Sequence, residues 1–180
     1  MKQKAHIAIF DLDGTLVDTD AANAAAYDVA LQRFGFATLD GMYGRVSSNI
    51  VRKAAKLRDD EMNAVIRAKV DAYRRQLGRT CLGPAVGALR YVRDNRNAFS
   101  KVVLLTDSAE RRAYETLRFW SLDGCFEEIV CNGGNGDKYA NYFSSFDSDP
   151  AACVVWENEN RQINAAIAAG VKNENIRKVA

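Results

Sequence analysis

Two aspartates near the start of the chain, Asp11 and Asp13, have the type and spacing to bind a divalent cation. They follow the apolar run 5–10, which predicts a buried parallel strand. Residues two apart in an extended chain point the same way, so both carboxylates should face one spot. Such a pair favours a bound cation, and Mg²⁺ prefers oxygen ligands. A bare D-x-D that only caps a turn is the alternative.

Gly14 follows this pair and permits a tight turn with close backbone approach. Exposed N–H groups in such a turn can bind a phosphate, which makes Gly14 a candidate substrate-binding residue.

Strands and helices are predicted to alternate along the rest of the chain. Further strands are expected at 101–105, 126–131, 152–156 and 176–180, and helices at 20–34, 49–77 with a break near 58–60, 84–95, 109–120, from about 137 and at 163–169. This alternation predicts an α/β fold with a Rossmann-like parallel sheet flanked by helices.

Polar residues follow three of the predicted strands. They are Asp11 and Asp13, then Thr106, Asp107 and Ser108, and then Glu157, Asn158 and Glu159. In open parallel sheets ligands bind at the carboxyl ends of the strands. The sequence therefore predicts one site at this edge.

The helices predicted at 49–77 do not fit a simple crossover between the first two long strands. They suggest a small helical cap over residues 20–80, inserted into an α/β core made of 1–19 and 81–180. Most of the basic side chains in this segment should form a solvated face. Arg45 is the one we select as a substrate-binding candidate, because arginine binds phosphate bidentately.

The run Phe10-Asp11-Leu12-Asp13-Gly14-Thr15-Leu16-Val17-Asp18 closely resembles the first signature of the haloacid dehalogenase superfamily. The resemblance implies that Asp11 is the nucleophile that forms an aspartyl-phosphate. It implies that Asp13 is the general acid and base, which favours a phosphatase over a true dehalogenase. It also implies Mg²⁺ as the cofactor.

Two further superfamily motifs have counterparts here. Thr106 resembles the strand-terminal Thr or Ser that hydrogen-bonds the transferring phosphoryl group, although its hydroxyl could instead cap the next helix. Lys138, at the start of a predicted helix, resembles the lysine that neutralises the nucleophile and the phosphate. Asp107 and Ser108 are predicted to line the substrate site beside Thr106.

The fourth motif departs from the superfamily pattern. Asn158 takes the position that usually supplies a metal-binding Asp, and Gln162 takes that of the usual helix-side Asp. Asp11, Asp13 through its backbone carbonyl, and Asn158 are the predicted metal ligands. An amide carries no formal charge, so weakened metal binding is expected, unless Glu157 or Glu159 restores negative charge.

These residues predict a Mg²⁺-dependent phosphatase that acts on a small phosphorylated metabolite. Two alternatives remain open. One is a catalytically weakened relative that binds a phosphorylated ligand or a protein, and the other is a phosphosugar mutase. The residues do not identify the substrate.

Composition excludes several other classes. The 180 residues are 48% hydrophobic and 27% charged with a net charge of +2, which gives no general signal for nucleic acid. No apolar run predicts a membrane span or a secretory signal, so a cytoplasmic location is expected. The four cysteines lack metal-ligand spacing and are expected to be free thiols. Oligomeric state stays open.

Overall fold

The computed structural model describes residues 6–39 and 45–179. The chain divides into two compact units, one made of Met1–Val17 and Leu82–Ala180 and the other of Asp18–Cys81. Each unit has its own hydrophobic core.

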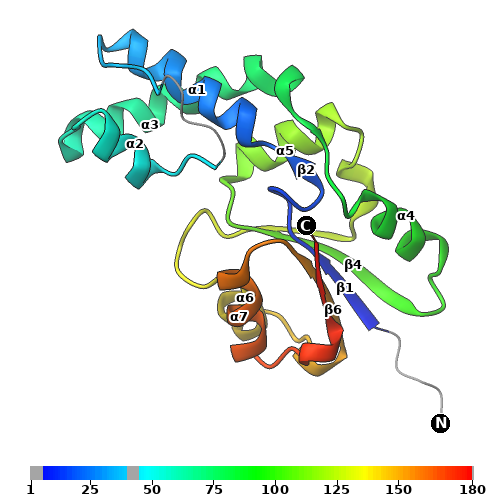
Figure 1. The fold of residues 1–180 in the computed structure, drawn as a ribbon. Helices are drawn as coiled ribbons and strands as arrows, with labels where there is room; N and C mark the ends of the chain where they lie inside the picture. Colours follow the sequence, from blue (N-terminus) through cyan, green and yellow to red (C-terminus); the bar gives the residue numbers. More distant parts are fainter. Residues whose placement is uncertain (1–5, 40–44, 180) are drawn as a thin grey trace. The chain divides into compact units, whose positions relative to one another are not determined.

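The first unit is built on a five-stranded parallel sheet, with β1 at its centre (Figure 1). Its order is β5-β4-β1-β6-β7, from β1 (His6–Phe10), β4 (Phe99–Thr106), β5 (Glu128–Cys131), β6 (Cys153–Glu157) and β7 (Ile176–Lys178). The order reverses on the two sides of β1, which is where open parallel sheets bind their ligands.

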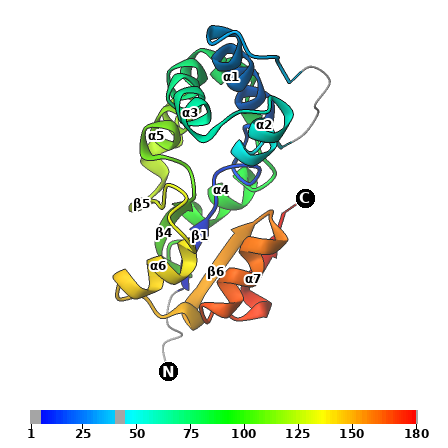
Figure 2. The same cartoon turned by 90° about the vertical axis from the view of Figure 1, so that its left-hand side faces the viewer.

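Helices cover both faces of this sheet (Figures 1 and 2). On one face Phe10, Leu104 and Trp156 form a core with α4 (Val86–Asp94) and α5 (Glu110–Phe119). On the other face Ile9, Leu105 and Val155 pack with α6 (Lys138–Ser145) and α7 (Asn160–Ala168). Alternate residues of the central strands thus enter opposite cores, which is why these strands are apolar without interruption.

The second unit is helical. It contains α1 (Asp20–Arg33), α2 (Ser48–Ala54), α3 (Asp59–Tyr73) and the 3₁₀ segment η1 (Arg74–Arg79). Its main core is formed by Leu31, Val51 and Val65 with their apolar neighbours. Ser47 caps α2 by accepting a hydrogen bond from the backbone N–H of Ile50 at 3.3 Å.

The observed elements confirm the predicted α/β class with its parallel sheet. The helix expected over 49–77 is divided into α2, α3 and η1. A small sheet of β2 (Val17–Asp18) and β3 (Cys81–Leu82) was not predicted, because strands of two residues carry no periodicity. Residues 40–44, within the predicted cap, lie outside the described residues.

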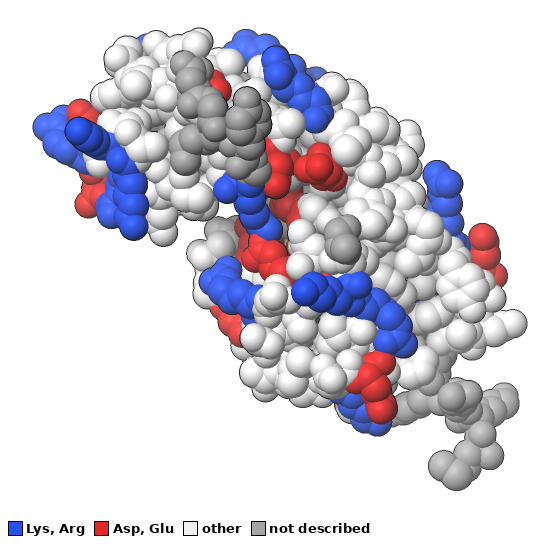
Figure 3. Space-filling model, viewed as in Figure 1, with Lys and Arg blue, Asp and Glu red and all other residues white. Residues whose placement is uncertain are grey.

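Charged side chains of both signs are scattered over the face shown in Figure 3. Within residues 6–39 and 45–179 no helix has both the length and the apolar character needed to cross a membrane. The cysteines are free, as expected.

Candidate active site

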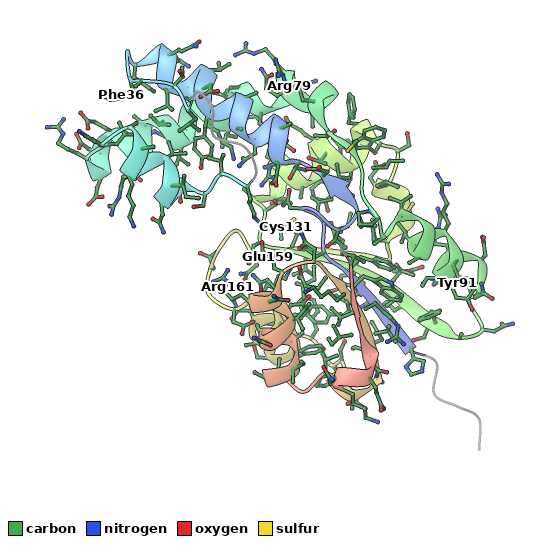
Figure 4. The ribbon with its side chains drawn as sticks, in the orientation of Figure 1. Phe36, Arg79, Tyr91, Cys131, Glu159 and Arg161 are labelled. Carbon is green, nitrogen blue, oxygen red and sulfur yellow. The ribbon has the colours of Figure 1, made fainter. Side chains whose placement is uncertain are left out.

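Three neighbouring parallel strands end at the same edge of the sheet and carry polar residues there. Asp11 follows the last residue of β1, Thr106 ends β4, and Glu157 ends β6. The N–H of Asp11 donates to the carbonyl of Trp156 at 3.1 Å, which fixes the start of the motif to the neighbouring strand. In Figure 4, Cys131 at the end of β5 and Glu159 after β6 mark this edge.

A buried ion cluster lies at the centre of the edge. Lys138 Nζ donates to Asp11 Oδ1 at 2.6 Å and to Glu157 Oε2 at 2.8 Å. The side chains of Lys138 and Glu157 are each 1% exposed and that of Asp11 is 9% exposed. A buried charge is tolerated only when it is paired, and here one ammonium serves two carboxylates.

Every oxygen of Glu157 is occupied. The hydroxyl of Tyr139 donates to Oε2 at 3.0 Å, and the N–H groups of Asn158 and Glu159 donate to Oε1 at 3.0 and 3.2 Å. Glu157 therefore anchors Lys138. Asp11 Oδ2, by contrast, receives no hydrogen bond from any described residue, which leaves it for a ligand.

Burial and the charges of the ion cluster shift the pKa values of its residues and of the adjoining Tyr139. Burial raises the pKa of Asp11 to about 7, although the charge of Lys138 opposes this. Burial disfavours the charge on Lys138, but the Asp11 and Glu157 carboxylates outweigh it and raise the pKa of this lysine above its ordinary value. Burial and the Glu157 charge raise the pKa of Tyr139 well above its ordinary value.

Lys138 reaches the cluster because α6 begins at this residue. The Asp137 side chain caps the helix by accepting from the N–H groups of Tyr139 and Ala140, at 2.9 and 3.1 Å. The preceding turn has three glycines at positive φ, Gly133, Gly134 and Gly136. Residues other than glycine rarely adopt these positive φ angles, which allow the turn that leads from β5 into the helix.

Asp13 is held by two residues that follow β4. The Ser108 hydroxyl donates to Asp13 Oδ2 at 2.5 Å, and Arg112 on α5 forms an ion pair with Asp13 Oδ1. The N–H of Ser108 donates to Thr106 Oγ1 at 3.1 Å, and Thr106 is completely buried. The segment after β4 thus connects the second motif to the first.

Asp107 has its two oxygens bound by amides. Gln162 Nε2 donates to Oδ2 at 2.6 Å, and Asn132 Nδ2 donates to Oδ1 at 2.8 Å. Gln162, which replaces the usual acid on α7, therefore has a carboxylate partner in Asp107. The negative charge of this pair lies on the loop after β4 rather than on the helix.

Asn158 lies against the turn of the first motif. Its Oδ1 is 3.4 Å from the Thr15 hydroxyl, and a Cβ at Gly14 would come within 2.1 Å of its Nδ2. Gly14 also has a φ of +80°, a conformation that favours glycine. Gly14 is therefore needed both for its backbone shape and for the approach of Asn158.

Oxygen atoms of the kind that Mg²⁺ binds lie at this edge. Among the described side chains, no group of three or more His, Cys, Asp and Glu could hold a metal. Among the described residues, nevertheless, none donates a hydrogen bond to Asp11 Oδ2, and Asn158 Oδ1 accepts only the long contact from the Thr15 hydroxyl. Mg²⁺ is commonly held by one or two carboxylates together with waters and substrate phosphate, so Asp11, the Asp13 carbonyl and Asn158 could suffice.

The structure brings most of the predicted site residues to one edge of the first unit. These are Asp11, Asp13, Gly14, Thr106, Asp107, Ser108, Lys138 and Asn158. Arg45 is exposed before α2 in the second unit, and its contact with a substrate stays a prediction.

Two residues of the site were missed from the sequence. Tyr139 follows Lys138 directly, and its hydroxyl is fully enclosed. Arg112 pairs with a residue 99 positions away in the chain, so only the fold reveals the contact.

Known proteins resemble this chain over nearly its full length. A model of the haloacid dehalogenase-like hydrolases matches residues 8–175. A phosphorylated carbohydrates phosphatase from Thermotoga maritima is 25% identical, over 91% of this chain and 81% of the relative.

Solved structures show the same fold. A provisionally assigned β-phosphoglucomutase from Thermotoga maritima superimposes with a TM-score of 0.69 at 26% identity, covering 96% of this chain and 84% of the other. A predicted phosphoglycolate phosphatase from Haemophilus somnus has a TM-score of 0.76 at 19% identity, with 94% and 84% covered. With the family model matching almost the whole chain, this protein belongs to the haloacid dehalogenase-like hydrolases.

Proposed function

We propose that this protein is a Mg²⁺-dependent phosphatase that hydrolyses a small phosphorylated carbohydrate through an aspartyl-phosphate on Asp11. The substrate class is taken from the similarity to the Thermotoga phosphatase of phosphorylated carbohydrates. The observation that carries the reaction is the buried contact of Lys138 with Asp11 at 2.6 Å, which holds a cation against the proposed nucleophile.

In the first half of the reaction, an oxygen of Asp11 attacks phosphorus and the bond to the leaving oxygen breaks. Asp13 gives its proton to that oxygen, so the sugar leaves as a neutral alcohol. Lys138 offsets the negative charge of the transferring group. The Thr106 hydroxyl, whose oxygen accepts from the Ser108 N–H, keeps its own hydrogen for a phosphoryl oxygen.

In the second half, Asp13 takes a proton from water, and the water oxygen attacks the phosphorus of the aspartyl-phosphate. The bond to the Asp11 oxygen breaks, which releases phosphate and restores both carboxyl groups. Splitting the hydrolysis into two displacements is the advantage of a carboxylate nucleophile.

Mg²⁺, when bound by Asp11, the Asp13 carbonyl and Asn158, would neutralise charge between the nucleophile and the phosphate. The amide of Asn158 adds no charge to this set, so we expect weak binding that strengthens when phosphate is present.

The test is phosphate release from p-nitrophenyl phosphate and from a panel of sugar phosphates, with Mg²⁺ and with EDTA. We expect turnover with Mg²⁺ that Asp11→Asn abolishes. Intact-mass measurement after rapid quenching should show one phosphoryl group on the wild type and none on the variant. If neither the wild type nor the variant released phosphate from any compound of the panel, the proposal would be contradicted.

A catalytically weakened binding protein is the second candidate, and the amide at Asn158 favours it. Calorimetry separates the two functions, because this candidate requires phosphate-ligand binding without measurable Mg²⁺ binding. An Asn158→Asp variant that stays inactive would support this second candidate.

A phosphosugar mutase is the third candidate, and the similarity to the provisionally assigned β-phosphoglucomutase favours it. Such an enzyme would return the phosphoryl group of Asp11 to a second sugar hydroxyl rather than to water. Phosphorus NMR of a sugar monophosphate, with a trace of the bisphosphate, would show an isomer instead of inorganic phosphate.

A further inference from the structure

Arg112, Ser108 and Asp13 form a closed ring of hydrogen bonds at the edge of the sheet. Arg112 Nη1 donates to Ser108 Oγ at 2.9 Å, and the Ser108 hydroxyl donates to Asp13 Oδ2 at 2.5 Å. Arg112 Nη2 closes the ring on Asp13 Oδ1. Because Arg112 occupies the acceptor side of the serine oxygen, the serine hydrogen is directed to the aspartate.

The ring is largely shielded from solvent. The side chains of Arg112 and Asp13 are 18% and 14% exposed, and Ser108 is buried. Other arginines of α5 differ: Arg111 pairs with Glu115 at 55% exposure, and Arg118 is 72% exposed. Charge-assisted contacts that are partly buried fix the orientation of a side chain better than exposed ion pairs do.

We propose that Arg112 is a positioning residue that, with Ser108, fixes the Asp13 carboxylate for proton transfer. The proposal rests on the proposed function, in which Asp13 is the acid and base. A carboxylate has about four lone-pair sites, and the ring uses one on each oxygen of Asp13.

Arg112 lies close in the chain to Ser108 of the ring and to Thr106 of the phosphoryl site. The residue lies in the first turn of α5, directly after the segment that carries Thr106 and Ser108. Thr106 Oγ1 accepts from the Ser108 N–H, so the phosphoryl-binding hydroxyl and the ring share one short loop. A shift of Arg112 would thus change the position of Asp13, which it contacts, more than that of the nucleophile Asp11.

The two halves of the reaction should respond differently to its loss. A leaving group that departs easily as an anion, such as 2,4-dinitrophenolate, does not need the proton of Asp13 in the first half. Water attack in the second half always needs Asp13 as a base. Removal of Arg112 should therefore make the aspartyl-phosphate accumulate with the activated substrate.

The experiment compares Arg112→Met, Arg112→Lys and Ser108→Ala with the matched control Arg111→Met. We expect Arg112→Met to lower kcat for an alkyl phosphate about 100-fold with little change in KM, since general acid–base catalysis contributes about 10²–10⁴-fold. With 2,4-dinitrophenyl phosphate it should give a burst of one product per active site. Arg112→Lys should recover part of kcat, Ser108→Ala should lose less, and Arg111→Met should match the wild type.

A uniform loss with both leaving groups and no burst would overturn the proposal, as would wild-type kcat in Arg112→Met. Crystal structures of the wild type and Arg112→Met provide a readout without turnover. The Asp13 carboxylate should change orientation in the variant, and an unchanged orientation would also overturn the proposal. Failure of the proposed function is distinct, because the wild type would then be as inactive as Asp11→Asn.

Discussion

The site has two sides with different chemistry. On the nucleophile side, Asp11, Lys138 and Glu157 form a buried network of ion pairs. On the other side, the amides of Asn158 and Gln162 take positions where the family resemblance leads one to expect acids. Gln162 nevertheless has a full partner, because Asp107 supplies the carboxylate it binds at 2.6 Å. An altered motif can thus keep its hydrogen bonds while it offers a metal less negative charge.

The largest effect is expected from Lys138→Met on the nucleophile side. The variant would leave the buried Glu157 carboxylate without its cation and would favour protonation of Asp11, which costs about 3–5 kcal/mol of unfolding free energy. Urea unfolding at neutral pH measures this loss.

Lys101→Met is the matched control for that change. Lys101 pairs with Glu128 at the start of β4, and its side chain is 34% exposed. Its loss should cost less than about 1 kcal/mol. Equal losses in the two variants would show that the buried pairing of Lys138 adds no more stability than a partly exposed ion pair.

On the amide side, Asn158→Asp should strengthen Mg²⁺ binding by about tenfold or more, because a second carboxylate joins Asp11. The two side chains have nearly the same shape, so the fold should not change. Isothermal titration with Mg²⁺ in the presence of phosphate measures the affinity. The control is Asn160→Asp, at the exposed first residue of α7. It should leave the Mg²⁺ affinity unchanged.

The Asp107–Gln162 pair can be tested by exchanging its polarity. Gln162→Glu alone would set two carboxylates against each other and should lower the unfolding free energy by about 1–2 kcal/mol. Adding Asp107→Asn supplies an amide donor and should recover most of that loss, since Asn132 can still donate to the new side chain. Additive losses in the double variant would show that the pair does not act as a unit.

A smaller effect is expected from the pH dependence of stability. Burial raises the pKa of Asp11 to about 7 from 3.8, so the folded chain binds this proton more tightly than the unfolded chain does. Stability contributed by this group is therefore present at low pH and is lost as the pH rises from about 4 through about 7. In EDTA, the Tm of the wild type should fall by a few degrees more over this interval than that of Asp11→Asn.

Much of this arrangement was predictable from local sequence. Apolar runs ending in Asp11 and Thr106 identified two neighbouring strands, and Asp137-Lys138 identified the start of α6. Because parallel strands end at one edge, the motifs after β1 and β4 could be expected to lie together. That Lys138 would meet Asp11 followed from the resemblance to the haloacid dehalogenase superfamily.

The remainder depended on contacts that no local pattern encodes. Arg112 looks like any basic residue on an amphipathic helix until α5 is placed beside Asp13. Asp107 and Gln162 are 55 positions apart, so their hydrogen bond could not be inferred from either residue alone. Such side-chain pairings arise when the elements pack, whereas the elements themselves follow from periodicity.

The stack of Phe10 on Trp156, with ring centroids 4.3 Å apart and planes inclined by 10°, gives the protein an optical reporter. Phe10 immediately precedes Asp11 at the end of β1, and Trp156 immediately precedes Glu157 at the end of β6, so the indole lies next to two members of the ion cluster. The chain has only one other tryptophan, Trp120. Trp120→Phe would therefore make Trp156 the sole indole emitter, and its fluorescence would follow ligand arrival in real time without a label.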